Sequence, residues 1–498
     1  MMNPLRYLLH RGLACGWLAL CLLGQIHADA QVRPTGLIFD DAAYDAAPAM
    51  VVPGGGSKFG DVKMLVDLRS LAPIPGSQGS MGSCVGWAAG YAAMTIEYAR
   101  LRDRSDRQTI TREAFSPLYI YNQIKVGHCE YGSRIEDALN LLQTQGDVQR
   151  SDFDPPICDV LPTADLRARA AASRIEEYMT IFRLDAPPNE KIQRTKLLLA
   201  NGKPVIVGMR IRNNFLNIAP GQTLWRPLEG DTAIAGGHAM AVVGYDEGRQ
   251  AFLLFNSWGP DWGDGGCIWV AYRDYGIYCK YAYAIKAATP REVVQQVSLS
   301  GTFAFRYPDG AGKEIVQVGP QQIPFARAAV RYTGSHYETV QPTWYTGQLF
   351  QLVAMNTRAD EYVYAFSIDA AGQANIHWPL RQGLDFSDFE GMNNAPLIPI
   401  SGAELVIPAP DQAMQLQTPG IDHLCVLFSV RRIDDAGFSQ IVRSVRDGQG
   451  AFADRLRQAL GDKLIPPGSI RYLPDEMAFT ASSNSGYIVP LILQVKAE

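Results

Sequence analysis

The run Gln78-Gly-Ser-Met-Gly-Ser-Cys84 decides the fold prediction, because it ends in a thiol at the start of a long apolar segment. Small and apolar residues continue to position 101, so we expect a buried helix over 84–101. A thiol at a helix N-terminus lies at the positive end of the helix dipole, which favours the thiolate and lowers its pKa. Gln78 lies six residues upstream, where its side-chain amide can stabilise an oxyanion at the same place. A buried structural cysteine gives the same local pattern, so this run alone leaves both interpretations open.

A second run, Gly236-Gly-His-Ala-Met-Ala-Val-Val-Gly-Tyr245, places a histidine at the start of an apolar strand. Another apolar run, Phe252-Leu-Leu-Phe-Asn-Ser-Trp-Gly259, follows at once, and a hairpin between them brings His238 close to Asn256. The imidazole then pairs with the Cys84 thiolate, and the Asn256 amide holds the ring in place. Because the three spacings agree, we predict a nucleophile, a base and an orienting residue rather than an isolated core histidine.

In this order the glutamine–cysteine, Gly-His-Ala and Asn-Ser-Trp-Gly-Pro-Asp-Trp-Gly blocks resemble those of papain-family cysteine peptidases. The resemblance covers about residues 60–290. It implies an α+β, two-lobed peptidase with a helical lobe and an antiparallel β lobe. It also implies Cys84 as nucleophile, His238 as base and acid, Asn256 as orienting residue and Gln78 as oxyanion donor.

Two positions depart from the family pattern. Val85 follows the nucleophile where an aromatic residue is usual, and Met81 stands where the family usually has a disulfide cysteine. The long helical propeptide of the animal and plant enzymes is also missing. The sequence therefore looks like a divergent bacterial branch, and it leaves substrate choice and zymogen control undetermined.

The run Cys129-Glu-Tyr-Gly-Ser-Arg-Ile-Glu-Asp-Ala-Leu139 resembles the glycine segment that pairs with extended substrates in that family. By this resemblance Gly132 and Ser133 line the cleft, although Ser133 also fits the N-cap of a following helix. Gly237 borders the same side of the cleft. Trp258 is expected at the site too, where it shields the histidine–asparagine hydrogen bond from water.

The N-terminus has the features of an export signal. Arg6 and Arg11 precede a short apolar run, and Ala28-Asp-Ala30 favours cleavage after residue 30. We therefore expect a signal peptide over 1–30, a secreted or periplasmic protein, and no membrane span after cleavage. Residues 31–59 form a lead-in segment whose apolar stretch, Leu37–Phe39, either lies in the cleft as an inhibitor or packs on the surface.

The composition is that of a globular protein of more than one domain. The chain has 498 residues, of which 47% are hydrophobic and 19% charged, and its formal net charge of −5 gives no indication of a nucleic-acid partner. Helical and strand patterns alternate up to residue 290. We predict helices over 134–145, 164–178 and 189–201, and strands over 204–210, 238–246, 251–256 and 267–273.

Short strands dominate residues 300–498, which we predict to be a β-sandwich with a helical insert at 438–460. Residues 347–430 resemble an uncharacterised bacterial β domain often found after peptidase or kinase modules. Its role and its partner are not indicated by the residues.

Export would permit disulfides. We predict a bond between Cys129 and Cys158, and a second between Cys267 and Cys279. A bond from Cys129 to Cys425 is the rival of the first pairing. The mature chain has six cysteines, at positions 84, 129, 158, 267, 279 and 425.

The predicted function is a cysteine peptidase that hydrolyses peptide bonds of a protein or peptide substrate through a thioester on Cys84. No metal-binding motif or phosphate loop is seen in the sequence, so we expect neither a metal nor a cofactor. Two alternatives stay open. One is a papain-fold acyltransferase or deamidase, and the other is a non-catalytic binding protein on a peptidase scaffold.

Overall fold

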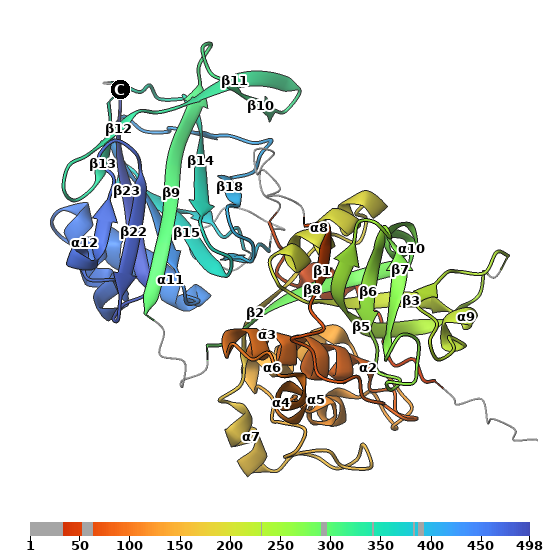
Figure 1. Ribbon diagram of the computed structural model, residues 1–498. Coiled ribbons are helices and arrows are strands. Elements are labelled where there is room, and N and C mark those ends of the chain that lie inside the picture. Colours follow the sequence, from red (N-terminus) through yellow and green to blue (C-terminus); the bar gives the residue numbers. More distant parts are fainter. Residues whose placement is uncertain are drawn as a thin grey trace, which may run out of the picture.

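The computed structural model describes residues 33–51, 63–230, 232–289, 296–340, 343–381, 384–386 and 393–498. Figure 1 shows two bodies, which we call the N-terminal region (residues 33–289) and the C-terminal region (residues 296–498). The first combines helices with a sheet and the second is mainly β, which confirms the predicted α+β class. The predicted signal peptide lies outside the described residues. Within the described ranges, no helix has the length and apolar character needed to cross a membrane.

One continuous helical segment, residues 84–101, forms the centre of the helical layer and matches the predicted helix. It starts as an α-helix, widens to a π-helix and narrows again at Thr95, whose hydroxyl donates to the Gly90 carbonyl at 3.3 Å. The segment is buried up to Ala99, because its many small residues let other elements approach closely. The helices of this layer are α2 (Cys84–Gly86), η1 (Trp87–Met94), α3 (Thr95–Leu101), α4 (Arg107–Arg112), α5 (Pro117–Ile124), α6 (Ile135–Thr144) and α7 (Ala164–Ala170).

The sheet beside this layer carries the predicted histidine strand at its centre. Its order is β2-β8-β3-β5-β6-β7-β4 with β1 paired to β5, and β4 with β7 is its parallel pairing. The hairpin of β5 and β6 forms as predicted, since Ala241 pairs with Phe255. The strands are β1 (Leu65–Asp67), β2 (Ile175–Thr180), β3 (Val205–Arg212), β4 (Leu224–Trp225), β5 (Ile234–Asp246), β6 (Ala251–Phe255), β7 (Cys267–Ala271) and β8 (Cys279–Ala287), with helices α8 (Pro188–Ala200), α9 (Asn213–Leu216) and α10 (Tyr272–Tyr278).

Two predictions for the N-terminal region are wrong. The helix predicted over 164–178 ends at Ala170, and β2 takes the later residues because its largely buried face pairs with β8. Cys267 and Cys279 are separate, buried free thiols rather than a disulfide. They begin β7 and β8, and β3, β5 and β6 lie between these strands. Four strand spacings amount to about 19 Å, far beyond the reach of a disulfide.

The C-terminal region consists of two sheets that pack face to face, with two helices. Phe428 of one sheet contacts Phe479 of the other at a ring distance of 5.3 Å. The first sheet contains β9 (Val297–Pro308), β10 (Glu314–Val318), β11 (Gln321–Arg327), β14 (Leu349–Asn356), β18 (Glu404–Ile407), β19 (Met414–Gln415), β21 (Ile470–Tyr472) and β22 (Ala478–Ser483). The second contains β12 (Val330–Tyr332), β13 (Tyr337–Thr339), β15 (Glu361–Ile368), β16 (Ala374–Trp378), β17 (Leu397–Ile398), β20 (Gly420–Ser429) and β23 (Ile488–Ala497). The predicted helical insert is present as α11 (Asp435–Asp447) and α12 (Phe452–Leu460), and short 3₁₀ turns are η2 (Gly461–Lys463) and η3 (Pro467–Ser469).

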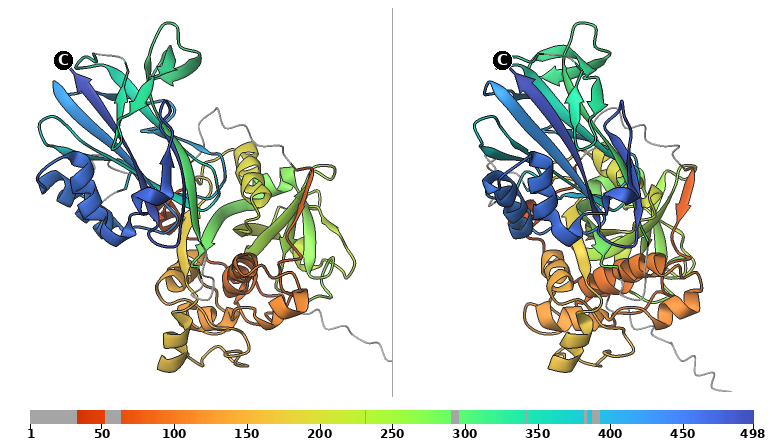
Figure 2. Two further views of the ribbon diagram at one scale, coloured as in Figure 1. Left: turned by 60° about the vertical axis from the view of Figure 1, so that its left-hand side comes forward. Right: turned by 90° about the vertical axis from the view of Figure 1, so that its left-hand side faces the viewer.

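Buried ion pairs join the two regions, which lie against each other in both views of Figure 2. Lys203, 1% exposed, lies 3.2 Å from Glu97 of its own region and 2.8 Å from Asp360 of the C-terminal region. Arg432 crosses in the other direction and lies 2.9 Å from Glu177. Buried charges need such partners, since an unpaired one is costly to remove from water. The relative position of the two regions is therefore fixed by specific contacts.

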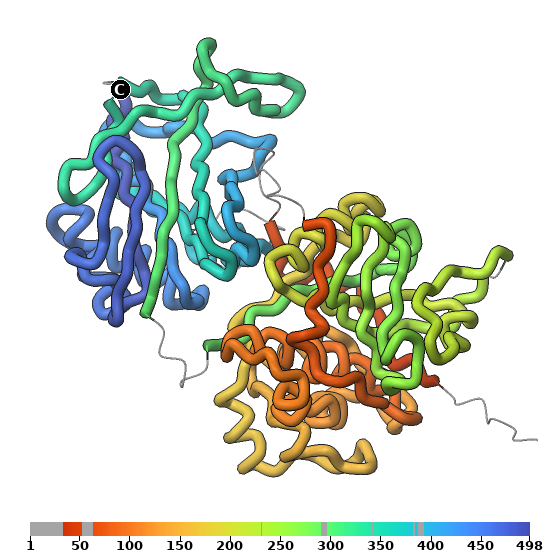
Figure 3. Tube along the Cα trace, viewed as in Figure 1, coloured from red at the N-terminus to blue at the C-terminus, as the bar shows by residue number. Residues whose placement is uncertain are grey.

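The first described residues, 33–51, cross the N-terminal region between its helices and its sheet, and we call them the strap. Figure 3 shows this darkest red segment in part, because the green strands lie in front of it in that view. It contains one short helix, α1 (Asp41–Ala46), whose N-cap Asp40 accepts from the Ala43 N–H at 3.1 Å. The strap lies where the sequence predicts the substrate cleft.

Candidate active site

The four predicted catalytic side chains come from four places in the fold. Cys84 begins α2, His238 lies on β5, Asn256 directly follows β6, and Gln78 lies in the loop before α2. His238 Nε2 is 2.7 Å from Asn256 Oδ1. The N–H of Ala239 donates to Cys84 Sγ at 3.5 Å, so the sulfur lies against the histidine strand. The structure thus brings thiol, imidazole and amide together.

The imidazole is held by its surroundings as well as by the amide. Trp258 stacks on the His238 ring with centroids 4.5 Å apart and an interplanar angle of 25°. Within the described structure, His238 Nδ1 has no hydrogen-bond partner. Since Nε2 is engaged by Asn256, Nδ1 is the nitrogen left to exchange a proton with Cys84. Trp258 therefore lies on the imidazole, where the sequence analysis expects it to shield the histidine–asparagine hydrogen bond.

Gln78 is oriented by a residue that the sequence analysis missed. The Ser257 hydroxyl donates to Gln78 Oε1 at 2.5 Å, and the Gln78 N–H donates to the Ser257 carbonyl at 2.8 Å. Because the amide oxygen is fixed by Ser257, Nε2 lies on the opposite side of the amide group. There it donates to the Pro34 carbonyl at 3.3 Å and to the Met81 carbonyl at 2.7 Å. The adjacency of Ser257 to Asn256 was the available signal.

Burial determines the protonation of the pair in this structure. It raises the pKa of the Cys84 thiol to about 11, although the N–H groups of Ala239 and Gly36 lower it. Burial also lowers the pKa of His238 to about 4, and the Asn256 bond only partly offsets this effect. The low thiol pKa expected from the helix N-terminus is therefore wrong for this closed state. Both groups are neutral at pH 7 because burial disfavours their charged forms.

The strap binds both walls of the cleft through its main chain. One wall is formed by β5, where the Leu37 N–H donates to the Gly237 carbonyl at 3.1 Å. On the opposite wall, the Ile38 N–H donates to the Ser133 carbonyl at 3.0 Å, and the Ser133 N–H donates to Gly36 at 2.9 Å. The bridge between Leu37 and Ser133 is parallel. Two predicted binding residues, Ser133 and Gly237, thus contact a peptide segment of the chain itself.

Glycines make this close approach possible. A Cβ atom on Gly132 would lie 2.1 Å from the Gly36 carbonyl oxygen, and one on Gly237 would lie 2.5 Å from the Leu37 oxygen. On the strap itself, a Cβ on Gly36 would lie 1.9 Å from the Gly82 oxygen. Real side chains do not tolerate such distances, so each position needs glycine. The alternative N-cap role of Ser133 is not seen, because Arg134 is the N-cap of α6.

Charged and aromatic groups fix the strap beyond the cleft. Asp41 pairs with Lys280 at 2.5 Å and accepts from the Tyr281 hydroxyl. Tyr44 stacks on Tyr281 with centroids 4.4 Å apart, and its own hydroxyl donates to the Phe182 carbonyl at 2.7 Å. These contacts hold α1 on the surface of β8.

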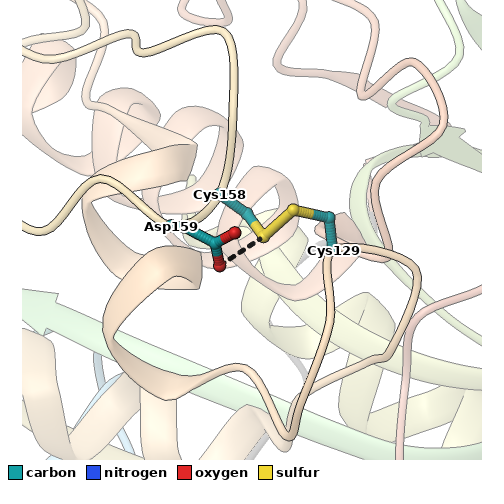
Figure 4. A group of neighbouring side chains, drawn as sticks. All are labelled: Cys129, Cys158 and Asp159. Atoms are coloured by element: carbon teal, nitrogen blue, oxygen red, sulfur yellow. Dashed lines mark hydrogen bonds between the residues drawn. A yellow bond between two sulfur atoms is a disulfide. The ribbon is translucent and has the colours of Figure 1, made fainter.

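A disulfide joins Cys129 to Cys158, with their Cα atoms 5.5 Å apart, as the sequence analysis predicted. Figure 4 shows it connecting two loops, with the Asp159 carboxylate beside the Cys158 sulfur. These three residues are the group in the described ranges whose spacing could suit a metal ion, but both sulfurs are engaged in the bond. Cys425 is a buried free thiol, so the rival pairing is wrong. The bond anchors the loop that leads into Gly132.

Comparison with known proteins points to one family. A model of the papain family cysteine proteases matches residues 72–288. An uncharacterised peptidase C1-like protein of Acanthamoeba polyphaga mimivirus is 26% identical over 225 residues, which are 42% of this chain and 69% of that protein. A cathepsin B-like protein of Giardia intestinalis is 34% identical over 88 residues, which are 17% of this chain and 26% of the relative. The chain thus spans about a quarter of the length of this second relative.

Among solved structures, xylellain, a cysteine protease from Xylella fastidiosa, is 24% identical and has a TM-score of 0.41. The match covers 51% of this chain and 95% of that one. A digestive procathepsin L 3 of Tenebrio molitor is 20% identical with a TM-score of 0.37, covering 49% of this chain and 77% of the other. Both matches cover about half of this chain.

Proposed function

Because residues 72–288 belong to the papain family of cysteine proteases, we propose that Cys84, His238, Asn256 and Gln78 are the catalytic residues of this cysteine-type peptidase. One observation carries the assignment. His238 is bonded to Asn256 at 2.7 Å while the N–H of the next residue contacts the Cys84 sulfur at 3.5 Å. A peptidase of this kind acts on a protein or peptide substrate.

The chemistry follows from these positions. Cys84 Sγ attacks the substrate carbonyl carbon while His238 takes the thiol proton, and the oxygen becomes an oxyanion next to Gln78 Nε2. The intermediate collapses to a thioester as His238 gives the proton to the leaving amine. Water then attacks the thioester carbonyl with His238 as base, and the acid product leaves as the thiol reforms. Asn256 keeps the imidazole oriented through both halves.

The test is a peptide-library digest that compares the parent chain, processed to remove the strap, with a Cys84→Ala variant. We expect the variant to cut nothing. Cys425→Ala is the matched control, since it removes another buried free thiol far from the site and should leave cleavage unchanged. Cleavage by Cys84→Ala at the parental rate would exclude Cys84 as the nucleophile. Added amines that appear in the products would show acyl transfer instead of hydrolysis.

We propose further that the strap inhibits the site in the precursor. It lies in the cleft between Ser133 and Gly237, and its Gly36 N–H hydrogen-bonds to the Cys84 sulfur. While the strap occupies this position, a substrate chain cannot make the same main-chain contacts with Ser133 and Gly237. Removal of the strap would readmit water, lower the thiol pKa and raise that of His238. Deletion of residues 31–55 should therefore raise turnover, and unchanged turnover together with an unchanged inhibitor on-rate would leave the strap only a packing role.

Secretion or export to the periplasm is part of the proposal, with residues 1–30 as signal peptide. It is supported by the N-terminal sequence pattern and is compatible with the Cys129–Cys158 bond. We assign 60–290 to the peptidase domain and 300–498 to a β accessory domain. N-terminal sequencing of exported protein should begin at Gln31, and a chain that keeps residues 1–30 in the cytosol would contradict export.

A further inference from the structure

The far end of the strap is paired on two sides. Pro48 and Met50 face the peptidase strand β2, where the Thr180 N–H donates to Pro48 and the Met50 N–H donates to Thr180, both at 2.8 Å. Ala49, between them, faces the other way. Its N–H donates to the Asn393 carbonyl at 2.7 Å, and its carbonyl accepts from the Ala395 N–H at 3.0 Å. Residues 48–50 therefore form an extended segment that makes β-bridges to both the N-terminal and the C-terminal region.

A side chain of the C-terminal region adds a third bond. Asn393 Nδ2 donates to the Ala46 carbonyl at 2.6 Å. Ala46 is the last residue of α1, where carbonyls lack partners within the helix. Asn393 is itself fixed, because Arg381 donates to its Oδ1 at 3.1 Å and also pairs with Asp435 at 3.1 Å. We call residues 393–395 the clasp.

The region that carries the clasp is paired with the N-terminal region through buried charges. Asp360 of the C-terminal region pairs with Lys203 at 2.8 Å and with Arg100 at 2.9 Å. Lys286 donates to the Val430 carbonyl at 2.9 Å on the same interface. Separation of the two regions would leave these charges buried without a partner, which is costly. The ion pairs therefore hold the C-terminal region against the N-terminal region. The clasp can therefore act on the strap as a fixed support.

We propose that the C-terminal region is a regulator of the peptidase, whose clasp binds residues 46–49 and thereby keeps the strap in the cleft. The strap makes three backbone hydrogen bonds to Ser133 and Gly237, and it makes three hydrogen bonds to the clasp. The two ends are connected by the short helix α1, so release at the clasp removes part of what holds the strap in the cleft. A ligand or partner that moves the C-terminal region would promote activation. The inferred control of peptidase activity rests on the proposed function, whereas the contact between clasp and strap does not.

The experiment measures amide hydrogen exchange in the full chain carrying Cys84→Ala, so that no self-cleavage occurs. The probes are the N–H groups of Leu37 and Ile38, which are bonded in the cleft far from the clasp. Asn393→Ala removes the bond to Ala46, and we expect exchange at both probes to become roughly 5- to 10-fold faster, the effect of one lost hydrogen bond. Asn394→Ala is the matched control, because within the described ranges the Asn394 side chain forms no hydrogen bond with the strap, and it should leave exchange unchanged.

A second variant guards against misfolding of the clasp. Ala49→Pro removes the N–H that reaches Asn393 and keeps the bonds of Pro48 and Met50 to β2, so it should also speed exchange at the probes. Exchange at Leu37 within twofold of the parent in both variants overturns the proposal. Failure of the proposed function is a different result. It would appear as a Cys84→Ala digest equal to the parent, whereas the exchange experiment uses an inactive chain and is indifferent to activity.

Discussion

Shortening Leu37 to alanine tests the strap where it lies deepest. The side chain is 7% exposed and belongs to the apolar cluster that also contains Cys84 and Ala239. Leu37→Ala removes about three carbon atoms from this cluster, and at about 0.8 kcal/mol for each the strap loses about 2 kcal/mol of binding free energy. Since each 1.4 kcal/mol is tenfold, the open population should rise roughly 30-fold.

The assay is the rate at which iodoacetamide alkylates Cys84 in the uncleaved precursor, identified by peptide mapping. Reagent reaches the sulfur only in the open state, so the rate follows the open population. Leu141→Ala is the matched control, because Leu141 lies in the same cluster at 8% exposure but on α6 rather than on the strap. An acceleration of less than about threefold for Leu37→Ala would refute the reasoning, and so would equal acceleration by the control variant.

Three further outcomes are expected. Gln78→Ala should lower kcat/KM of the processed enzyme by roughly 10²–10³-fold through kcat, as loss of one oxyanion donor does; an unchanged kcat would remove Gln78 from the site. The ion pair with Lys280 holds the pKa of Asp41 below its usual range, so this contribution to strap binding is present above about pH 4 and is lost as pH falls through the lowered pKa. Exchange protection of the strap should drop at acid pH, and a Lys280→Gln chain should lack that step. Replacing Cys129 and Cys158 by serine should lower the free energy of unfolding by roughly 3–4 kcal/mol in the chain-entropy model, measured by urea titration; a midpoint insensitive to reductant in the parent would contradict it.

Local patterns predicted the elements that carry the site. The helix over 84–101 and the hairpin that joins His238 to Asn256 depend on apolar periodicity and on residues close in sequence, which the chain displays directly. The helix predicted over 164–178 fails for the complementary reason. Its second half is recruited into β2 by pairing with β8, more than a hundred residues later, and no local pattern reports such a partner.

Features that depend on backbone contacts between distant parts of the chain could not be predicted from the sequence. The Leu37 N–H meets the Gly237 carbonyl, and neither side chain takes part in that bond. The thiol pKa was mispredicted because the helix N-terminus is visible in the sequence, whereas the burial that outweighs it exists only in the folded structure. The contacts of Asp360 with Lys203 were likewise invisible, since charged residues at exposed and buried positions look alike in a sequence.

The strap is covalently part of the chain that it blocks, so its occupancy of the cleft depends on an effective concentration rather than on the protein concentration. A tethered segment experiences an effective concentration of about 1 mM, so one whose free form binds with a Kd of about 10 µM occupies the cleft roughly 99% of the time. After a single cut the same peptide is diluted to the concentration of the protein itself. At about 10 nM it leaves the cleft nearly empty, with no change in any contact. A single cut thus makes opening of the cleft irreversible, because the released strap is diluted. In the uncut protein, even a weakly binding strap is enough to inhibit the site.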